Sequence, residues 1–388
     1  MIDNQTNQEL NQLLSTTNQQ STPQSTPQSN PLNPLENTLS PISAGELVPP
    51  SQNQSIVTIQ LTSSEIASLW LTYVNDSMAM CVISKFLTEV IDTDAKRVLE
   101  QAHRLSESHL NIVAQILKEE GHETPRGFGE EDVWINSPRL YFDSFFIMYM
   151  QNMASIGMTF YSTVLSDAYR QDVRNLYTEA LKTSVDLHNM ATEVMAGKGI
   201  LTRSPYYTSY FKSSFVRHED TFFSSIFGKK QPLLSFEVGK LFNNIQKNIV
   251  GEALLLGFSQ VAQSEEVRKY MVKGKDISKD HITTMTSILN IENLPTSMVS
   301  DFLPTTSTIP PFSDKLMMFH TTSLIAIGAA NYGVAMSTSV RNDLHIAYTR
   351  MITEIGAYAI EGAKIMIKNG WLEQPPQTAD RTELSKRS

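Results

Sequence analysis

Two stretches of the sequence repeat each other and decide the fold. Residues 63–86 read SSEIASLWLTYVNDSMAMCVISKF, and residues 235–258 read SFEVGKLFNNIQKNIVGEALLLGF. At this offset of 172 residues, Glu65 aligns with Glu237. With an offset of 172 or 171, the alignment continues through these pairs: His109 and His281, Asp143 and Asp314, Gly157 and Gly328, Tyr161 and Tyr332, Gly199 and Gly370. One residue of slippage over so long a stretch indicates duplication of a single structural unit.

Each copy of this unit predicts four helices. Ser63 and Ser235 are the expected N-caps of the first helices, and Gly199 and Gly370 are the glycines expected just beyond the last ones. The predicted helices are 63–90, 93–119, 141–167 and 172–198 in the first copy, and 235–262, 265–290, 313–338 and 343–369 in the second. The predicted buried seam of the helix at 93–119 is Ala95, Val98, Ala102, Leu105, His109, Ile112 and Ile116.

The lengths of the connections predict the topology. Only a few residues join the first helix to the second and the third to the fourth, so each of these pairs is antiparallel. About 20 residues join the second helix to the third, and at ~3.3 Å per residue they can cross the whole bundle. One long crossover is typical of ferritin-like bundles. We therefore predict an all-α chain with two tandem ferritin-like four-helix bundles, over residues 58–199 and 234–376.

Three further segments flank or join these bundles. Residues 1–57 are rich in Gln, Asn, Ser, Thr and Pro and hold no aromatic residue, which predicts a disordered tail. A tail that packs into an assembly is the alternative. Residues 200–233 form a linker, and residues 377–388 form a C-terminal tail. The linker is expected to lie against the bundles because it holds eight aromatic residues: Tyr206, Tyr207, Tyr210, Phe211, Phe215, Phe222, Phe223 and Phe227.

The third helix of each copy lacks charged residues. No Asp, Glu, Lys or Arg occurs in residues 144–165 or 316–340. That length is sufficient for a membrane span, but polar residues such as Asn152 and Asn331 interrupt both segments and no basic cluster follows either. We therefore expect no transmembrane segment, and helices that are buried all round where the two bundles join. The side chains expected to be almost wholly buried are Phe146, Met150, Leu324 and Ile327.

The composition disfavours several classes of protein. The net charge of −9 argues against nucleic acid as a partner, because phosphate binding needs a basic surface. The single cysteine, Cys81, lies in an apolar helical stretch, so a disulfide framework is excluded and an intracellular, cytoplasmic protein is expected. The first residues have neither a basic nor an apolar region of the kind that a secretion signal requires.

A di-iron centre is the chemistry most often found in ferritin-like bundles. It uses a glutamate from each of two helices and a Glu-x-x-His motif from each of the other two. Here Ser106 and Ser278 stand three residues before His109 and His281, where the paired glutamates belong. The sequence therefore predicts no complete di-iron centre, no catalytic residue and no cofactor.

The two seam histidines nevertheless predict a polar layer in each bundle. The helix directions place Asp76 near His109 and Glu354 near His281, and we expect each pair to be buried and hydrogen-bonded, because an unpaired buried polar group is costly. The main interpretation is a structural layer that fixes helix register. The alternatives are catalysis by these pairs and a residual metal site for iron, manganese or zinc, with Glu252 as a further ligand.

Several strings of the sequence resemble a known family. They are Leu61-Thr-Ser-Ser-Glu65, Leu255-Leu-Gly-Phe-Ser-Gln-Val-Ala262, Pro311-Phe-Ser-Asp-Lys-Leu-Met-Met-Phe-His320 and Asn369-Gly-Trp-Leu-Glu-Gln-Pro-Pro376. These strings resemble a family of unknown function from endospore-forming bacteria that has two ferritin-like domains and whose members are sometimes labelled spore coat proteins, by likeness to the coat protein F group. The resemblance covers about residues 58–385 and carries over no catalytic residue.

The resemblance implies a non-catalytic structural or assembly protein of the spore coat. Its partners would be other coat components or further copies of the chain. The alternatives are a metal-binding or redox ferritin-like protein with a degenerate site, and a small-molecule binder with a pocket between the bundles.

Overall fold

The computed structural model describes residues 59–206, 213, 215–216, 231–295 and 304–386. The chain divides into two units, Met1–Val57 and Thr58–Ser388. The tail predicted to be disordered lies outside the described residues, so that prediction and the boundaries of the predicted domains stay predictions. Within the described ranges the chain is helical and has no β-strand, only an isolated bridge between Val133 and Phe312.

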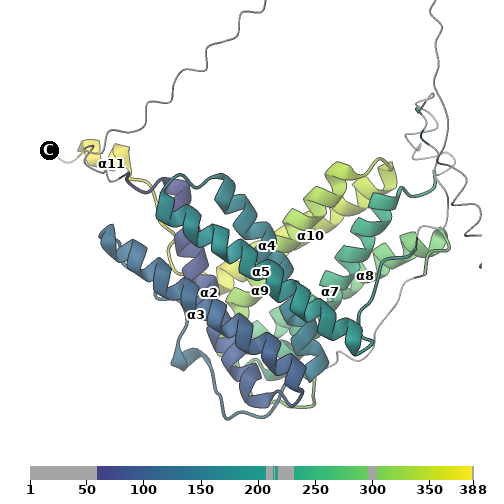
Figure 1. Ribbon diagram of the computed structural model, residues 1–388, viewed down its shortest axis with the longest axis horizontal. Coiled ribbons are helices and arrows are strands. Elements are labelled where there is room, and N and C mark those ends of the chain that lie inside the picture. The colour runs from purple at the N-terminus through teal and green to yellow at the C-terminus, as the bar shows by residue number, and fades with distance from the viewer. Residues whose placement is uncertain (1–58, 207–212, 214, 217–230, 296–303, 387–388) are drawn as a thin grey trace, which may run out of the picture. The chain divides into compact units, whose positions relative to one another are not determined.

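Eight long helices make up the described part, four in each copy of the repeat (Figure 1). The first copy has α2 (Ser63–Glu89), α3 (Thr93–Glu119), α4 (Asp143–Ser166) and α5 (Gln171–Gly197). The second has α7 (Ser235–Val261), α8 (Glu265–Ile291), α9 (Asp314–Thr338) and α10 (Asn342–Lys368). A short 3-10 helix, η1 (Glu130–Asp132), lies in the first crossover, and α11 (Arg381–Lys386) lies near the C-terminus. The all-α fold and the two tandem bundles are therefore confirmed.

Contacts between helix ends establish the direction of each helix. The carboxylate of Asp143, at the start of α4, accepts the backbone N–H of Asp92, just before α3, at 2.7 Å. The carboxylate of Glu65, near the start of α2, accepts the backbone N–H of Arg170, just before α5, at 2.8 Å. Helices α3 and α4 therefore start at the same end and run parallel, joined by the long crossover that the sequence predicts. The same contacts recur in the second copy, where Asp314 accepts from Gln263 and Ser264, and Glu237 accepts from Val340 and Arg341.

Helices α4 and α9 join the two bundles through their N-terminal halves. Tyr149 and His320 occupy equivalent positions of the repeat, and their side chains meet at 3.1 Å between the hydroxyl and Nε2. Tyr141, just before α4, donates its hydroxyl to the carbonyl of Leu254 in α7 at 2.7 Å. One apolar core therefore runs through both copies, with side chains from α2 to α10.

The expected burial of the third helices is only partly right. Phe146 and Met150 are almost wholly buried, as predicted. Leu324 and Ile327 are only half-buried, which corrects the prediction, because both line a cavity in the second bundle. The N-terminal halves of α4 and α9, which meet at the junction, are buried on all sides. The C-terminal half of each helix has one exposed face, which in α9 includes Val334.

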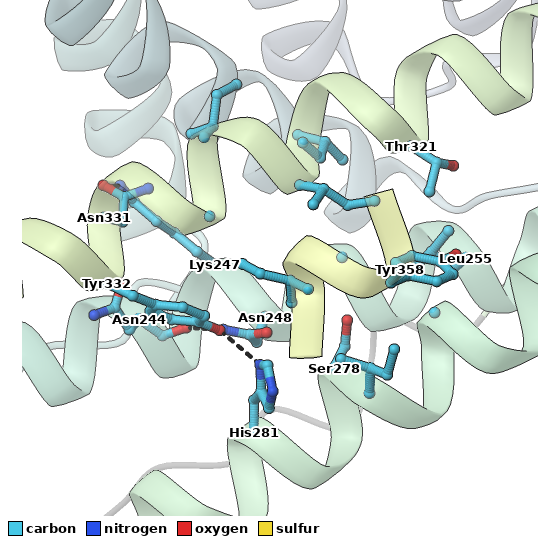
Figure 2. Close-up of a pocket in the computed structure, with 18 of the residues that line it drawn as sticks. Asn244, Lys247, Asn248, Leu255, Ser278, His281, Thr321, Asn331, Tyr332 and Tyr358 are labelled. Atoms are coloured by element: carbon cyan, nitrogen blue, oxygen red, sulfur yellow. Dashed lines mark hydrogen bonds between the residues drawn. The ribbon is translucent and has the colours of Figure 1, made fainter. Parts of the chain in front are cut away.

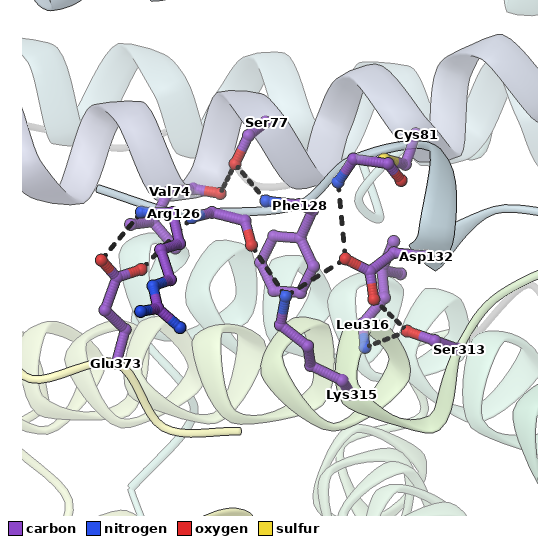
Figure 3. A network of polar contacts seen from close by, with 12 residues as sticks. Val74, Ser77, Cys81, Arg126, Phe128, Asp132, Ser313, Lys315, Leu316 and Glu373 are labelled. Carbon is purple, nitrogen blue, oxygen red and sulfur yellow. Dashed lines mark hydrogen bonds and ion pairs between the residues drawn. The ribbon is translucent and has the colours of Figure 1, made fainter. Parts of the chain in front are cut away.

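The two crossovers are held together by a polar network at the start of α9 (Figure 3). The carboxylate of Asp132 accepts the hydroxyl of Ser313 at 2.6 Å and the ammonium of Lys315 at 3.2 Å. Lys315 also donates to the carbonyl of Gly127 at 2.8 Å. Just before Gly127 in the first crossover, the backbone N–H of Arg126 donates to the carboxylate of Glu373 at 2.8 Å, which fixes the segment after α10.

Three local predictions need correction. The N-cap of α2 is Thr62 and not Ser63, because the hydroxyl of Thr62 accepts the N–H of Glu65 while Glu65 accepts the N–H of Thr62. The N-cap of α7 is likewise one residue earlier than predicted, at Leu234 and not Ser235, where Glu237 accepts the N–H of Leu234. In the linker, Tyr206 is 71% exposed under the guanidinium of Arg203, and Phe215 is 94% exposed, so neither lies against a bundle. The other six linker aromatics lie outside the described residues.

Helix α2 is, among the described helices, the one long and apolar enough to cross a membrane by length and composition. Half of its most apolar window is buried inside the protein. The core helix of a soluble protein meets the same criterion, so this feature is weak evidence for a membrane span.

Candidate functional site

A cavity of about 100 Å³ lies inside the second bundle. All four helices of that bundle line it, and Asn152 and Ile156 of α4 reach it from the first bundle. Three glycines line it: Gly251 and Gly328 leave space that a side chain could fill, whereas at Gly274 the side chain of Tyr358 occupies that place. Its apolar lining is Ile156, Leu255, Ile277, Leu324, Ile325, Ile327 and Ile355. At two of the three glycine positions the first copy carries Ala79 and Ala102 instead, so the backbone alone does not dictate this space.

Polar side chains gather on one side of the cavity. Figure 2 shows Lys247, Asn331, Tyr332 and Asn244 together on that side, with Leu255, Thr321 and Tyr358 on the other. Nζ of Lys247 donates to Oδ1 of Asn331 at 2.9 Å. Burial, together with the charge of Lys240, holds the pKa of Lys247 below its usual value. Lys247 is half-buried, and among the described residues no carboxylate pairs with its ammonium.

A chain of hydrogen bonds runs from the cavity through His281 to the surface. Nε2 of His281 lies 3.2 Å from a carboxylate oxygen of Glu354, and Nδ1 lies 2.9 Å from the hydroxyl of Tyr332. Nδ2 of Asn248 donates to the Tyr332 oxygen at 2.7 Å. These contacts assign the proton of a neutral imidazole to Nε2, which donates to Glu354, while Nδ1 accepts from Tyr332. Burial lowers the pKa of His281, and the hydrogen bond to Glu354 opposes that effect.

The equivalent layer of the first bundle is closed. The carboxylate of Asp76 accepts the hydroxyl of Ser106 at 2.9 Å and lies 3.2 Å from Nδ1 of His109. All three side chains are buried. The ring of Tyr161 packs edge-on against His109, as Tyr332 does against His281. Both bundles therefore keep the histidine and tyrosine, but only the first fills the layer with an aspartate.

The structure brings together both predicted histidine–carboxylate pairs, with one correction. Glu354 is not buried: its side chain is 41% exposed, because it meets His281 at the Nε2 edge, which faces the bundle surface. Glu252, a further candidate for a metal ligand, forms neither a hydrogen bond nor an ion pair with His281. It is half-buried, and burial raises the pKa of its carboxyl. Within the described part of the chain, no three His, Cys, Asp or Glu side chains are placed to hold a metal ion.

The sequence did not identify two polar residues that line the cavity of the second bundle, Lys247 and Asn248. Both lie in the first helix of the second copy and match no motif. The signal that identifies them is a difference between the copies: Asn75-Asp76 in the first becomes Lys247-Asn248 in the second. A charge change inside a bundle core is unusual enough to mark a position where the two copies diverge in role.

Comparisons with known proteins agree with the duplication. The family described as "Protein of unknown function (DUF3231)" matches residues 53–212 and again residues 221–384. The expectation of a two-repeat family of unknown function is thereby confirmed. No curated protein matches the chain. Among solved structures, one from Bacillus halodurans C-125 described as "a putative spore coat protein" is 17% identical, with a TM-score of 0.36; the match covers 39% of this chain and 98% of that one.

Proposed function

We propose that this chain, which belongs to the DUF3231 family of proteins of unknown function, is a small-molecule-binding protein whose site is the cavity of the second bundle. The observation that carries the proposal is the lining, in which several aliphatic side chains face a few convergent polar groups. Binding pockets for small molecules commonly have this composition and commonly lie between the helices of bundles. Both ring nitrogens of His281 already have partners, so the proposal is for binding and not for a reaction.

The energetics support a role beyond packing. Side chains that line a cavity have no packing partners on that side, so the second bundle loses contacts around the space of about 100 Å³. Each glycine within a helix costs about 0.5–1 kcal/mol more relative to alanine. The first copy avoids part of these costs with Ala79 and Ala102. The second copy keeps these costs in stability, which is expected if its cavity binds a ligand.

Filling the cavity tests the proposal. A Cβ added at Gly328 has only Cδ1 of Ile355 within reach, at 3.7 Å, so Gly328→Leu directs its side chain into the space without a backbone clash. The test compounds are small carboxylates, amides, alcohols and amines of about six non-hydrogen atoms. This size follows from the cavity of about 150 Å³ that holds benzene. We expect the wild-type protein to bind one or more of them. We expect Gly328→Leu to lose that binding while its melting temperature stays the same or rises. Ligand-observed NMR and thermal melting measure the two quantities.

Gly333→Leu is the matched control. It lies on the same helix, and a Cβ there meets nothing within 4 Å, so it gains helix propensity without touching the cavity. Binding that survives in Gly328→Leu as well as in Gly333→Leu would place the ligand elsewhere. A wild-type protein that binds no member of the panel would count against a binding function for this cavity.

A structural role in the spore is the second candidate, and its support is the sequence resemblance. It is compatible with the first, since a coat component can also bind a small molecule. The prediction is that the chain is recovered with the coat layer when spores are fractionated, and that it associates there with coat proteins or with itself. Recovery in the soluble contents of the spore core, or absence from spores, would contradict it.

A further inference from the structure

We infer that the ligand of this cavity is a short aliphatic carboxylate, with its anionic group at Lys247 and its carbon chain among the aliphatic side chains of α8, α9 and α10. This inference rests on the proposed function and adds the chemical class of the ligand. The observations that carry it are the unpaired cation, the aliphatic lining and one substitution between the two copies of the repeat.

The cation is the first observation. Nζ of Lys247 has three protons, and one of them bonds to Asn331. Lys247 is half-buried, and an ammonium that is partly removed from water is stabilised by an anion that faces it. The nearest carboxylate of the polar layer, Glu354, lies beyond the ring of His281 at Nε2, whereas Tyr332 occupies the cavity side at Nδ1. A bound anion would supply the missing partner.

The exchange between the copies is the second observation. Asp76 places a carboxylate in the first bundle, where it is held by Ser106 and His109. The second bundle has Asn248 at that position, and Nδ2 of this amide donates to Tyr332 and to the carbonyl of Asn244. The second copy has therefore lost the negative charge that would repel an anion and has gained Lys247 beside it. The ligand carboxylate would pair with Lys247 and not with the histidine, because both ring nitrogens of His281 already have partners.

The lining and the volume restrict the class further. A single lysine balances one negative charge, so a phosphate or a dicarboxylate would bring an excess charge into an aliphatic pocket. Seven leucine and isoleucine side chains favour a hydrocarbon chain on the ligand. The volume of about 100 Å³ limits its length to about that of propanoate or butanoate, since about 150 Å³ holds benzene.

Matched carboxylates and amides distinguish this inference from the proposed function. Propanoate and butanoate are titrated into the full chain by calorimetry, beside propanamide and butanamide, which have the same shape and no charge. We expect each carboxylate to bind at least about tenfold more tightly than its amide, because a hydrogen bond to a charged group is the stronger kind. Lys247→Met keeps the volume and removes the charge, and it should weaken carboxylate binding by about tenfold or more while leaving the amides unchanged. Lys364→Met, an exposed lysine of α10, is the control and should change neither.

The outcomes separate the two ideas. If the amides bind as well as the carboxylates to the wild-type protein, the anion inference is wrong while a binding function for the cavity stands. If no compound of either series binds, both are wrong. The comparison of the two series on the wild-type chain needs no variant, so a Lys247→Met protein that fails to fold would still leave the inference open to refutation.

Discussion

The two histidine–carboxylate pairs have the same length and different surroundings. In each, a ring nitrogen lies 3.2 Å from a carboxylate oxygen. The Asp76 side chain is 10% exposed and also accepts from Ser106, whereas the Glu354 side chain is 41% exposed. Water can replace a partner at the surface and cannot replace one in the core. Distance alone therefore does not measure what each pair contributes to stability.

This difference predicts unequal costs for the two carboxylates. Asp76→Ala leaves the hydroxyl of Ser106 and the ring of His109 without their buried partner, and we expect it to lower the free energy of unfolding by about 3 kcal/mol. Glu354→Ala exposes Nε2 of His281 to water, and the expected loss is below about 1 kcal/mol. Urea unfolding followed by circular dichroism gives both values. Equal losses would contradict this interpretation, because they would show that the exposed Glu354 contributes as much to the free energy of unfolding as the buried Asp76.

Helix ends were the part of the structure that the sequence predicted best. Each predicted boundary lies within two residues of the observed one, because ends depend on local chemistry that can be read along the chain. Gly199 and Gly370 have φ of 70° and 68°, which is the left-handed conformation expected for a glycine after a helix. Asp92 caps α3 by accepting the N–H groups of Asp94 and Ala95, which is local chemistry of the same kind.

The buried face of α3 was harder to predict, for a reason that lies in another helix. The three-four spacing favoured Leu105 and Ile112, yet Ile112 is 39% exposed, and Ser106 and Val113 are buried instead. Ser106 faces inward because Asp76 of α2 accepts its hydroxyl proton. Hydrophobic periodicity ranks leucine above serine, so it cannot find a polar residue whose partner is supplied by a neighbouring helix.

The cavity was hidden from the sequence for a related reason. The volume of the cavity depends on which side chain of a neighbouring helix packs against each glycine. Gly274 admits Tyr358, whose hydroxyl donates to the carbonyl of Tyr270 at 2.9 Å, and the two tyrosine rings stack. The first copy has Ala102 and Leu187 at the positions of Gly274 and Tyr358. A pair of substitutions in different helices thus changes the packing, and neither is remarkable when it is read alone.

This pairing predicts an unusual response to alanine. A Cβ at Gly274 would lie 2.1 Å from the Tyr358 hydroxyl oxygen, so Gly274→Ala should destabilise the protein by about 1–3 kcal/mol in spite of its better helix propensity. Adding Tyr358→Leu installs the pair found in the first bundle and should recover part of the loss. Gly356→Ala, where a Cβ meets nothing within 4 Å, should instead stabilise by about 0.5–1 kcal/mol. Chemical unfolding of the four proteins checks the order, and a neutral Gly274→Ala would contradict the packing argument.

At the scale of the whole molecule, the main apolar core runs through both bundles, and a smaller apolar cluster lies in the first bundle. The charge-free third helices were expected at the junction, and Tyr149 and His320 meet there from equivalent positions of the two copies. His320 is 1% exposed and packs edge-on against the rings of Tyr149 and Phe258. Burial lowers its pKa to about 3, so the imidazole stays neutral in the folded protein across the physiological range.

A buried neutral histidine at the junction makes the stability depend on pH. The ordinary pKa of 6.5 applies to His320 in the unfolded chain, and about 3 applies in the folded one. Between these values the unfolded state binds the additional proton, so stability is complete above pH 6.5 and falls as the pH is lowered towards 3. From pH 7.5 to pH 5 this single group should remove about 2 kcal/mol. His281 and His188, whose pKa values burial also lowers, act in the same direction, so the effect of His320 must be measured as a difference.

Replacing His320 by glutamine isolates that difference. The amide keeps an acceptor for the Tyr149 hydroxyl and does not titrate, so His320→Gln should show a loss between pH 7.5 and pH 5 that is smaller than that of the wild type by about 2 kcal/mol. His122→Gln, at an exposed residue of the first crossover, should behave as the wild type does. Because His320 lies where α4 and α9 meet, acidification should lower the unfolding midpoint of probes in both bundles together, such as single-tryptophan proteins that retain Trp70 or Trp371. If His320→Gln keeps the full wild-type dependence on pH, the junction histidine is not the group that couples proton binding to folding.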